Sequence, residues 1–206
     1  AESVFVYPSV DLAWQFSKLD LFVGSPILTF GKLRLAYGEV GVEPPPYNTQ
    51  SIYVSPNYSD SYGGSLSTDL FGAGSFTPSQ DLGDPNLRPE IKREYEVGTD
   101  IRFFDNKVKI GYSYYYNTTD DVFFNLSLAN SSGYDELFTN AGKIENKGME
   151  VDFSYDIIQN DNFKVNVNAN WSYYRNKVLD LKGVESIRLG GLSAVSGRAV
   201  EGYPLG

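Results

Sequence analysis

The chain contains no cysteine and no histidine among its 206 residues, and these two absences exclude several classes of site. Without cysteine there is no disulfide framework, no thiolate metal site and no cysteine nucleophile. Without histidine the chain lacks the commonest general base and the commonest zinc ligand. The composition therefore argues against an enzyme, and we assign no catalytic residue, no metal ligand and no cofactor.

Long apolar runs are also missing. No stretch of about 18 apolar residues occurs, which excludes a transmembrane helix, and no basic-then-apolar signal segment opens the chain. If the protein is exported, we expect this sequence to have lost its beginning. The net charge of −9 argues against a nucleic-acid partner. What is abundant is Tyr (16), Phe (13) and Gly (20), a composition typical of an all-β protein with many turns.

The clearest pattern lies between residues 149 and 173, where two segments alternate strictly between apolar and polar residues, as β-strands do. The apolar positions are Met149, Val151, Phe153, Tyr155 and Ile157 in the first segment, and Phe163, Val165, Val167, Ala169, Trp171 and Tyr173 in the second. Pairing Ile157 with Phe163 matches all apolar positions and sets Asp156 opposite Lys164. Each segment is about ten residues long, the length that a tilted strand needs to cross a bilayer.

Four further segments show the same alternation, at residues 10–16, 32–38, 94–103 and 108–117. Asp105 and Asn106 predict a tight hairpin turn between the last two, because both residues tolerate positive φ. Closing the hairpin there pairs Phe103 with Val108, Ile101 with Ile110 and Tyr95 with Tyr116. Six strands are thus predicted, with a seventh or eighth possible.

The connections between these strands alternate in length. Residues 42–89 and 118–147 are predicted to be long polar connections, separated by short ones, as in a transmembrane barrel with tight periplasmic turns and long outer loops. Trp14, Trp171 and the series from Tyr112 to Tyr116 fit aromatic girdles at the membrane interfaces. We therefore predict an all-β fold of antiparallel transmembrane β-barrel strands with long extracellular loops.

Five ordered motifs then resemble a known family. They are Pro8-Ser-Val-Asp-Leu-Ala-Trp14, Lys32-Leu-Arg-Leu-Ala-Tyr-Gly38, Asn86-Leu-Arg-Pro-Glu90 with Glu94-Tyr-Glu-Val-Gly98, Asn140-Ala-Gly-Lys-Ile-Glu-Asn-Lys-Gly-Met-Glu150 and Asn176-Lys-Val-Leu179. Together they resemble the C-terminal barrel region of SusC/RagA-like TonB-dependent transporters of Bacteroidetes outer membranes. The resemblance implies a 22-stranded barrel filled by an N-terminal plug and driven by the TonB complex.

The same resemblance implies partners and a location. A SusD-like surface lipoprotein would cap the barrel and help to capture oligosaccharides or oligopeptides, and the barrel would lie in the cell outer membrane, in contact with the lipid bilayer. Residues 1–206 would then be a partial barrel domain, without the plug, the TonB-contacting segment or the final strands. The turn-like sequence from Tyr203 to Gly206 favours this interpretation as a fragment.

Aromatic side chains in the first long connection are candidates for contact with the substrate or the lipoprotein, because aromatics often anchor interfaces. They are Tyr47, Tyr53, Tyr58, Tyr62 and Phe71. The alternative is that these side chains pack within the loop itself.

Two kinds of carboxylate group allow other chemistry. Asp120 with Asp121, and Asp81 with Asp84, could ligate calcium, although solvated loop carboxylates are favoured. Carboxylates also repeat along the polar faces, as Glu94, Glu96 and Asp100 in one strand and Glu150, Asp152 and Asp156 in another. A glycosidase would need two such groups isolated in a cleft, whereas repetition on several strands favours a water-facing lumen wall. A soluble β-sandwich that binds carbohydrate is the other alternative, and it predicts strands of about five or six residues in two packed sheets.

Overall fold

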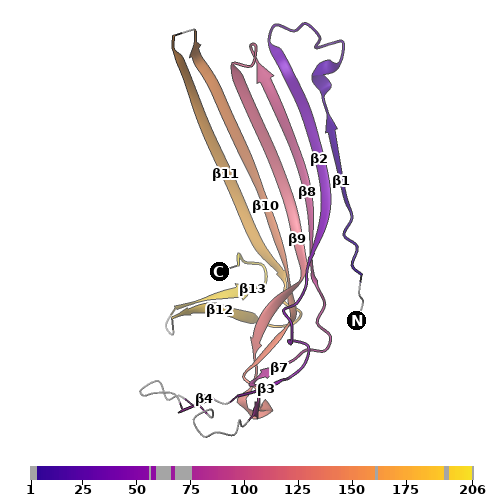
Figure 1. Ribbon diagram of the computed structural model, residues 1–206, viewed down its shortest axis with the longest axis vertical. Coiled ribbons are helices and arrows are strands. Elements are labelled where there is room, and N and C mark those ends of the chain that lie inside the picture. The colour runs from indigo at the N-terminus through magenta and orange to yellow at the C-terminus, as the bar shows by residue number, and fades with distance from the viewer. Residues whose placement is uncertain are drawn as a thin grey trace.

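A single large antiparallel sheet dominates the computed structural model, which describes residues 4–55, 57–58, 66–67, 76–160, 162–192 and 195–205 (Figure 1). In spatial order its long path contains β1 (Ser9–Trp14), β2 (Leu28–Val42), β8 (Glu90–Phe103), β9 (Val108–Ser127), β10 (Glu136–Gln159) and β11 (Lys164–Asp180). Each of these six strands pairs antiparallel with the next one on this path. The six predicted strands and their up-and-down order are therefore confirmed.

The strands are far longer than those of an ordinary soluble domain. From β2 to β11 along this path they have 15, 14, 20, 24 and 17 residues, whereas about ten residues of tilted strand cross a bilayer. In the described part of the chain the remaining sheets have only two strands each. The sandwich hypothesis, with its short strands in two packed sheets, is therefore wrong.

The two ends of the sheet differ in their connections. Figure 1 shows three connections at the upper end: residues 15–27, which include the 3-10 turn η1 (Phe16–Lys18), residues 104–107, and the short connection between β10 and β11, of which residues 160, 162 and 163 are described. At the lower end lie the described residues between 43 and 89, and residues 128–135 with the 3-10 turn η3 (Asn130–Ser132). In the described residues, no helix is long and apolar enough to cross a membrane.

The first long connection agrees with the prediction apart from its start, because β2 continues to Val42. Where the connection is described, its regular structure consists of two-residue strands: β3 (Tyr53–Val54), β4 (Asn57–Tyr58), β5 (Leu66–Ser67), β6 (Thr77–Pro78) and β7 (Asp81–Leu82). β3 pairs with β6, β4 pairs with β5, and β7 adds to the large sheet by pairing parallel with β10.

The prediction of a second long connection at residues 118–147 is wrong. β9 and β10 continue as paired strands from Tyr116–Lys147 to Ser127–Glu136, with irregular register around residues 140–144. The alternation of apolar and polar residues fails over this segment, so the sequence gives no periodic strand signal there. Asp121 adds to the break, since its positive φ of 57° interrupts the extended backbone.

The register of β8 and β9 is the predicted one, with Phe103, Ile101 and Tyr95 opposite Val108, Ile110 and Tyr116. Asp105 and Asn106 have φ values of 53° and 66°, as their place in the turn requires. The register predicted for β10 and β11 is wrong by two residues along most of the pair, up to Asp156, and by three beyond the irregularity that follows Asp156.

In β10 and β11, Asp156 lies opposite Asn166, and Lys164 lies opposite Gln159. Ile157 is bypassed at an irregularity between Asp156 and Ile158. A shift of two residues keeps every side chain on its own face, so the apolar pattern does not distinguish the two registers.

The apolar face of the sheet is largely uncovered, with Leu12 60% and Trp171 54% exposed. The packed core lies at the opposite side and near the lower end. There a hairpin of β12 (Ser186–Leu192) and β13 (Val195–Val200) packs against β9, β10 and β11. The buried residues of this core are Phe124, Ala141, Ile144, Val178, Leu181, Ile187 and Ala199. β12 and β13 thus form a separate two-stranded sheet and are not the seventh or eighth strand of the large sheet that the sequence analysis considered possible.

Candidate functional site

The polar face of the sheet is organised by cross-strand ion pairs between β2 and β8. Lys32 binds Asp100 at 2.9 Å, and Arg34 reaches both Asp100 (3.3 Å) and Glu96 (3.7 Å). Lys92 binds Glu94 at 2.6 Å within β8. These carboxylates, which the sequence placed on one face, are therefore engaged with cations rather than free to act as an acid and a base.

The carboxylates of β10 are in a different situation. Asp156 lies 3.9 Å from Lys109. Glu150 and Asp152 are exposed, and among the described residues no ion pair involves either of them. They stand two residues apart on one flat face rather than on opposite walls of a cleft, which is not the arrangement that glycoside hydrolysis uses.

Charged residues at the lower end of the sheet bind one another. Arg93 forms ion pairs with Glu39 and with Asp120, and Asp120 also binds Lys143 at 2.8 Å. Asp121 binds Lys182 at 2.6 Å. The described residues contain no group of three or more acidic side chains that could hold a metal ion. The aspartates considered for calcium at positions 120 and 121 thus serve as ion-pair partners.

The pair Asp81 and Asp84 has a structural role as well. Asp81 lies in β7, and Asp84 accepts hydrogen bonds from the backbone N–H of Asn86 (2.8 Å) and from the hydroxyl of Thr139 (2.5 Å). Asp84 therefore ties the end of the first long connection to β10.

Asn140 holds the same connection through its side-chain amide, a role that sequence reasoning missed. Its oxygen accepts a hydrogen bond from the Arg88 N–H at 2.8 Å, and its nitrogen donates to the Arg88 carbonyl at 2.8 Å and to the Asp121 carbonyl at 2.6 Å. The side chain is buried. Two of the motifs noted in the sequence, those beginning at Asn86 and Asn140, therefore meet in space.

The aromatic candidates of the first long connection fall into two groups. Tyr47 and Tyr53 are 77% and 71% exposed, so neither packs into the loop. Tyr58 lies in β4, where only its backbone is described. Tyr62 and Phe71 lie outside the described residues.

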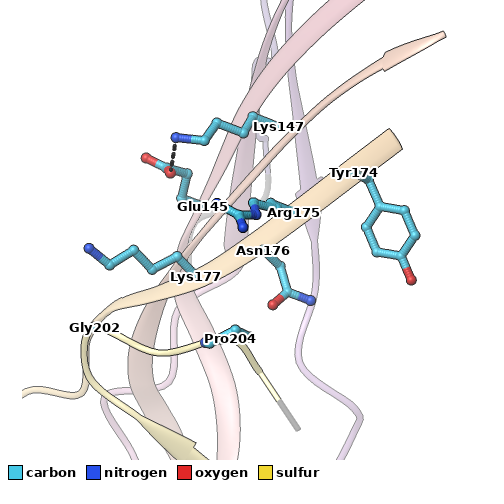
Figure 2. A pocket seen from close by; sticks show the side chains of 8 residues that line it. All are labelled: Glu145, Lys147, Tyr174, Arg175, Asn176, Lys177, Gly202 and Pro204. Atoms are coloured by element: carbon cyan, nitrogen blue, oxygen red, sulfur yellow. Dashed lines mark ion pairs between the residues drawn. The ribbon is translucent and has the colours of Figure 1, made fainter. Parts of the chain in front are cut away.

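A cleft of about 570 Å³ lies along the outer edge of β11 (Figure 2). It is lined by Glu145, Lys147, Tyr174, Arg175, Asn176, Lys177, Gly202 and Pro204. Figure 2 shows Lys147 and Lys177 on one side of β11 and Tyr174 on the other. Val178 exchanges backbone hydrogen bonds with Gly202 and Tyr203, so the segment after β13 returns to this edge.

Comparison with protein families decides what this sheet is. The model of the TonB dependent receptor-like β-barrel family matches residues 2–206. The chain belongs to the TonB-dependent receptor family. This membership removes the glycosidase hypothesis and places the sheet in the wall of an outer-membrane β-barrel.

Individual TonB-dependent receptors match over most of the chain. TonB-dependent receptor P26 of Formosa agariphila is 31% identical over 186 residues, which are 89% of this chain and 18% of that protein. TonB-dependent receptor SusC of Bacteroides thetaiotaomicron is 23% identical over 86% of this chain and 17% of its own length. The chain thus spans about a fifth of the length of these relatives.

A solved structure of the RagAB peptide transporter has the same fold, with a TM-score of 0.79 at 23% identity. The match covers 97% of this chain and 20% of that chain. In a TonB-dependent receptor barrel the apolar face meets lipid and the polar face lines the lumen. The tight turns then lie on the periplasmic side and the first long connection on the outer side.

Proposed function

We propose that residues 1–206 form part of the wall of a TonB-dependent active transporter that imports oligosaccharides or oligopeptides across the outer membrane. The plug, the TonB-contacting segment and the remaining strands of the barrel would come from other parts of the same protein. The observation that carries the proposal is the continuous two-faced sheet of long strands, which belongs to the receptor barrel family over its whole length.

The wall has the properties of a rigid frame rather than of a reaction centre. Its lumen face carries neutralised ion pairs that bridge adjacent strands, such as Lys32 with Asp100. Its outer end is fixed by hydrogen bonds that join β10 to the end of the long connection: the Thr139 hydroxyl donates to Asp84, and the Arg88 N–H donates to Asn140. In this proposal the plug moves during transport, and the wall holds the opening in shape.

We further propose that the first long connection contacts the substrate or a SusD-like surface lipoprotein that caps the barrel. The exposed side chains of Tyr47 and Tyr53 support this role, because an aromatic ring left in water gains free energy when a partner covers it. Tyr58, Tyr62 and Phe71 belong to the same proposed contact.

The test is an uptake assay in cells whose chromosomal copy of the full-length transporter is replaced. Cells that carry the unaltered gene should take up a labelled oligosaccharide or a labelled oligopeptide, and a deletion strain should not. The double variant Tyr47→Ala with Tyr53→Ala should reduce this uptake, or the co-purification of the lipoprotein, by roughly tenfold, as expected when interface aromatics are lost.

Phe104→Ala is the matched control, because Phe104 is an exposed aromatic in a tight turn at the other end of the sheet. It should leave uptake unchanged. Equal uptake of both labels by the deletion strain and the parent would reject the transport proposal. Unchanged uptake together with unchanged co-purification of the lipoprotein in the double variant would reject only the proposed role of the loop.

A further inference from the structure

The outer parts of β9 and β10 carry an aromatic platform. Their register places six side chains on one face of this hairpin: Phe123, Asn125 and Ser127 of β9, and Glu136, Phe138 and Asn140 of β10. The rings of Phe123 and Phe138 stack on this face, with centroids 5.1 Å apart and 29° between their planes. Both side chains are half-buried, so the stacked pair still presents apolar ring surface to solvent.

This face lines a cleft of about 500 Å³, and residues 188–190 of β12 line it as well. The Arg188 guanidinium donates a hydrogen bond to the Gly191 carbonyl at 3.5 Å, and it has further N–H groups for a ligand. The amide of Asn125 and the carboxylate of Glu136 belong to exposed residues of the same cleft. The cleft therefore combines an aromatic floor with planar polar groups.

The platform is held in place from the side of the membrane. The Glu90 carboxylate accepts a hydrogen bond from the Phe123 N–H at 2.6 Å. Asn140 stands on the same face, and its amide is tied to the backbone of Arg88 and Asp121. A site that is already ordered loses little conformational entropy when a ligand binds.

The chemistry of the cleft favours a sugar over a peptide. Sheets commonly recognise peptides by adding a strand at a free edge, but β10 pairs with β9 on one side and, at Glu136 and Leu137, with β7 on the other. The charges of Arg188 and Glu136 balance, so the cleft does not select a charged ligand. A pyranose ring offers C–H groups to the negative faces of aromatic rings. Its hydroxyls suit amide, carboxylate and guanidinium groups.

We propose that this cleft binds a pyranose ring of a neutral oligosaccharide. The sugar lies on the rings of Phe123 and Phe138, and its hydroxyls bond to Asn125, Glu136 and Arg188. This inference rests on the proposed transport function, because it selects oligosaccharides from the two substrate classes considered there. Binding at the cleft is nevertheless measured without uptake, so the two proposals fail separately.

The test is saturation-transfer difference NMR on the full-length transporter, in a detergent without a sugar headgroup. The probes are neutral hexasaccharides of glucose, mannose, galactose and xylose. At least one should bind the unaltered protein. The double variant Phe123→Leu with Phe138→Leu should bind that sugar on the order of tenfold more weakly, because it keeps apolar side chains but loses the aromatic faces. Arg188→Gln should lower the affinity by roughly tenfold through lost charge-assisted bonds.

Phe103→Leu with Phe104→Leu is the matched control, because it removes another neighbouring aromatic pair, with ring centroids 6.2 Å apart, at the tight-turn end of the sheet. It should bind the sugar like the unaltered protein. Folding of every variant is checked by the heat-dependent electrophoretic mobility of the barrel. If the double variant at residues 123 and 138 does not fold, Arg188→Gln at an exposed position carries the test.

Four results would overturn the inference. They are no binding of any of the neutral sugars, unchanged affinity in the Phe123/Phe138 and Arg188 variants, an equal loss in the control, and tighter binding of a galacturonic acid hexasaccharide than of every neutral one. If labelled oligosaccharide uptake persists alongside such a result, only the cleft is rejected. Equal uptake by the deletion strain and the parent rejects the transport proposal whatever the NMR titration shows.

Discussion

Asn140 has a buried amide that both accepts and donates, and this double capacity determines what can replace it. Asn140→Asp keeps the shape and the acceptor for the Arg88 N–H, but it removes both donors and faces the Arg88 and Asp121 carbonyls with a carboxylate. Unsatisfied buried groups cost about 1–3 kcal/mol each, so we expect a loss of roughly 3 kcal/mol. The measurement is urea unfolding of the full transporter in detergent.

Asn125→Asp is the control for this substitution, because Asn125 lies in the same hairpin with an exposed side chain. It should change stability by less than about 0.5 kcal/mol. Equal stability of the two variants would show that the Asn140 amide does not hold the long connection.

Gly148 is a second position where the addition of a single Cβ atom should destabilise the sheet. A Cβ atom there would meet the Tyr115 ring at 2.6 Å and the Tyr173 carbonyl oxygen at 2.6 Å, and the carbonyl belongs to the backbone of β11. Gly148→Val should therefore destabilise the barrel by about 1–3 kcal/mol through overpacking. Gly38→Val is matched to it, since a Cβ at residue 38 meets only the Ser9 Cβ, at 3.7 Å. A thermal melt in which residue 38 is the more sensitive position would contradict this account.

At the scale of elements, the register of β10 and β11 can be tested by cross-linking, because the chain has no cysteine of its own. Asp152 lies opposite Asn170 in the structure, whereas the register predicted from sequence would set it opposite Asn168. Directly opposed Cβ atoms are about 5 Å apart and diagonal ones about 7–8 Å. Asp152→Cys with Asn170→Cys should thus oxidise to a disulfide much faster than Asp152→Cys with Asn168→Cys, as mass spectrometry of the peptides would report. Faster disulfide formation with the cysteine at residue 168 would support the register predicted from the sequence.

The elements that sequence predicted well are those whose two faces meet different surroundings. Residues 94–103 and 108–117 alternate because one face meets lipid, and the turn at Asp105 and Asn106 then fixes their register. Beyond the membrane the same strands lose this contrast. The continuation of β9 through Asp121 and of β10 from Glu136 therefore gave no periodic signal, and it was predicted as a loop.

The candidate site was predictable only in part, for a related reason. Alternation identified the lumen carboxylates as a face, but it does not show that Glu96 and Asp100 share Arg34. The motif at Asn140 was visible in the sequence, yet its contact with Arg88 joins residues 52 positions apart. Such a contact follows from the long-range pairing of strands and has no local pattern.

At the scale of the whole molecule, the assignment of one face to lipid and the other to the lumen can be tested at two adjacent positions of β11. Ala169 lies in the apolar series and Asn170 in the polar one. A lysine near the middle of the lipid face costs about 2–4 kcal/mol, whereas lumen positions tolerate charge. Ala169→Lys should therefore lower the folded fraction in lipid vesicles strongly. Asn170→Lys should leave it unchanged or raise it, because residue 170 lies opposite Asp152.

The two variants differ by one position and add the same charge, so strand propensity and net charge cannot account for a difference between them. The folded fraction is read from heat-dependent mobility after refolding into vesicles over a urea series. A barrel that tolerates lysine at residue 169 and fails at residue 170 would reverse the two faces. A loss confined to residue 169 would support the assignment of the apolar face to lipid and of the polar face to the lumen.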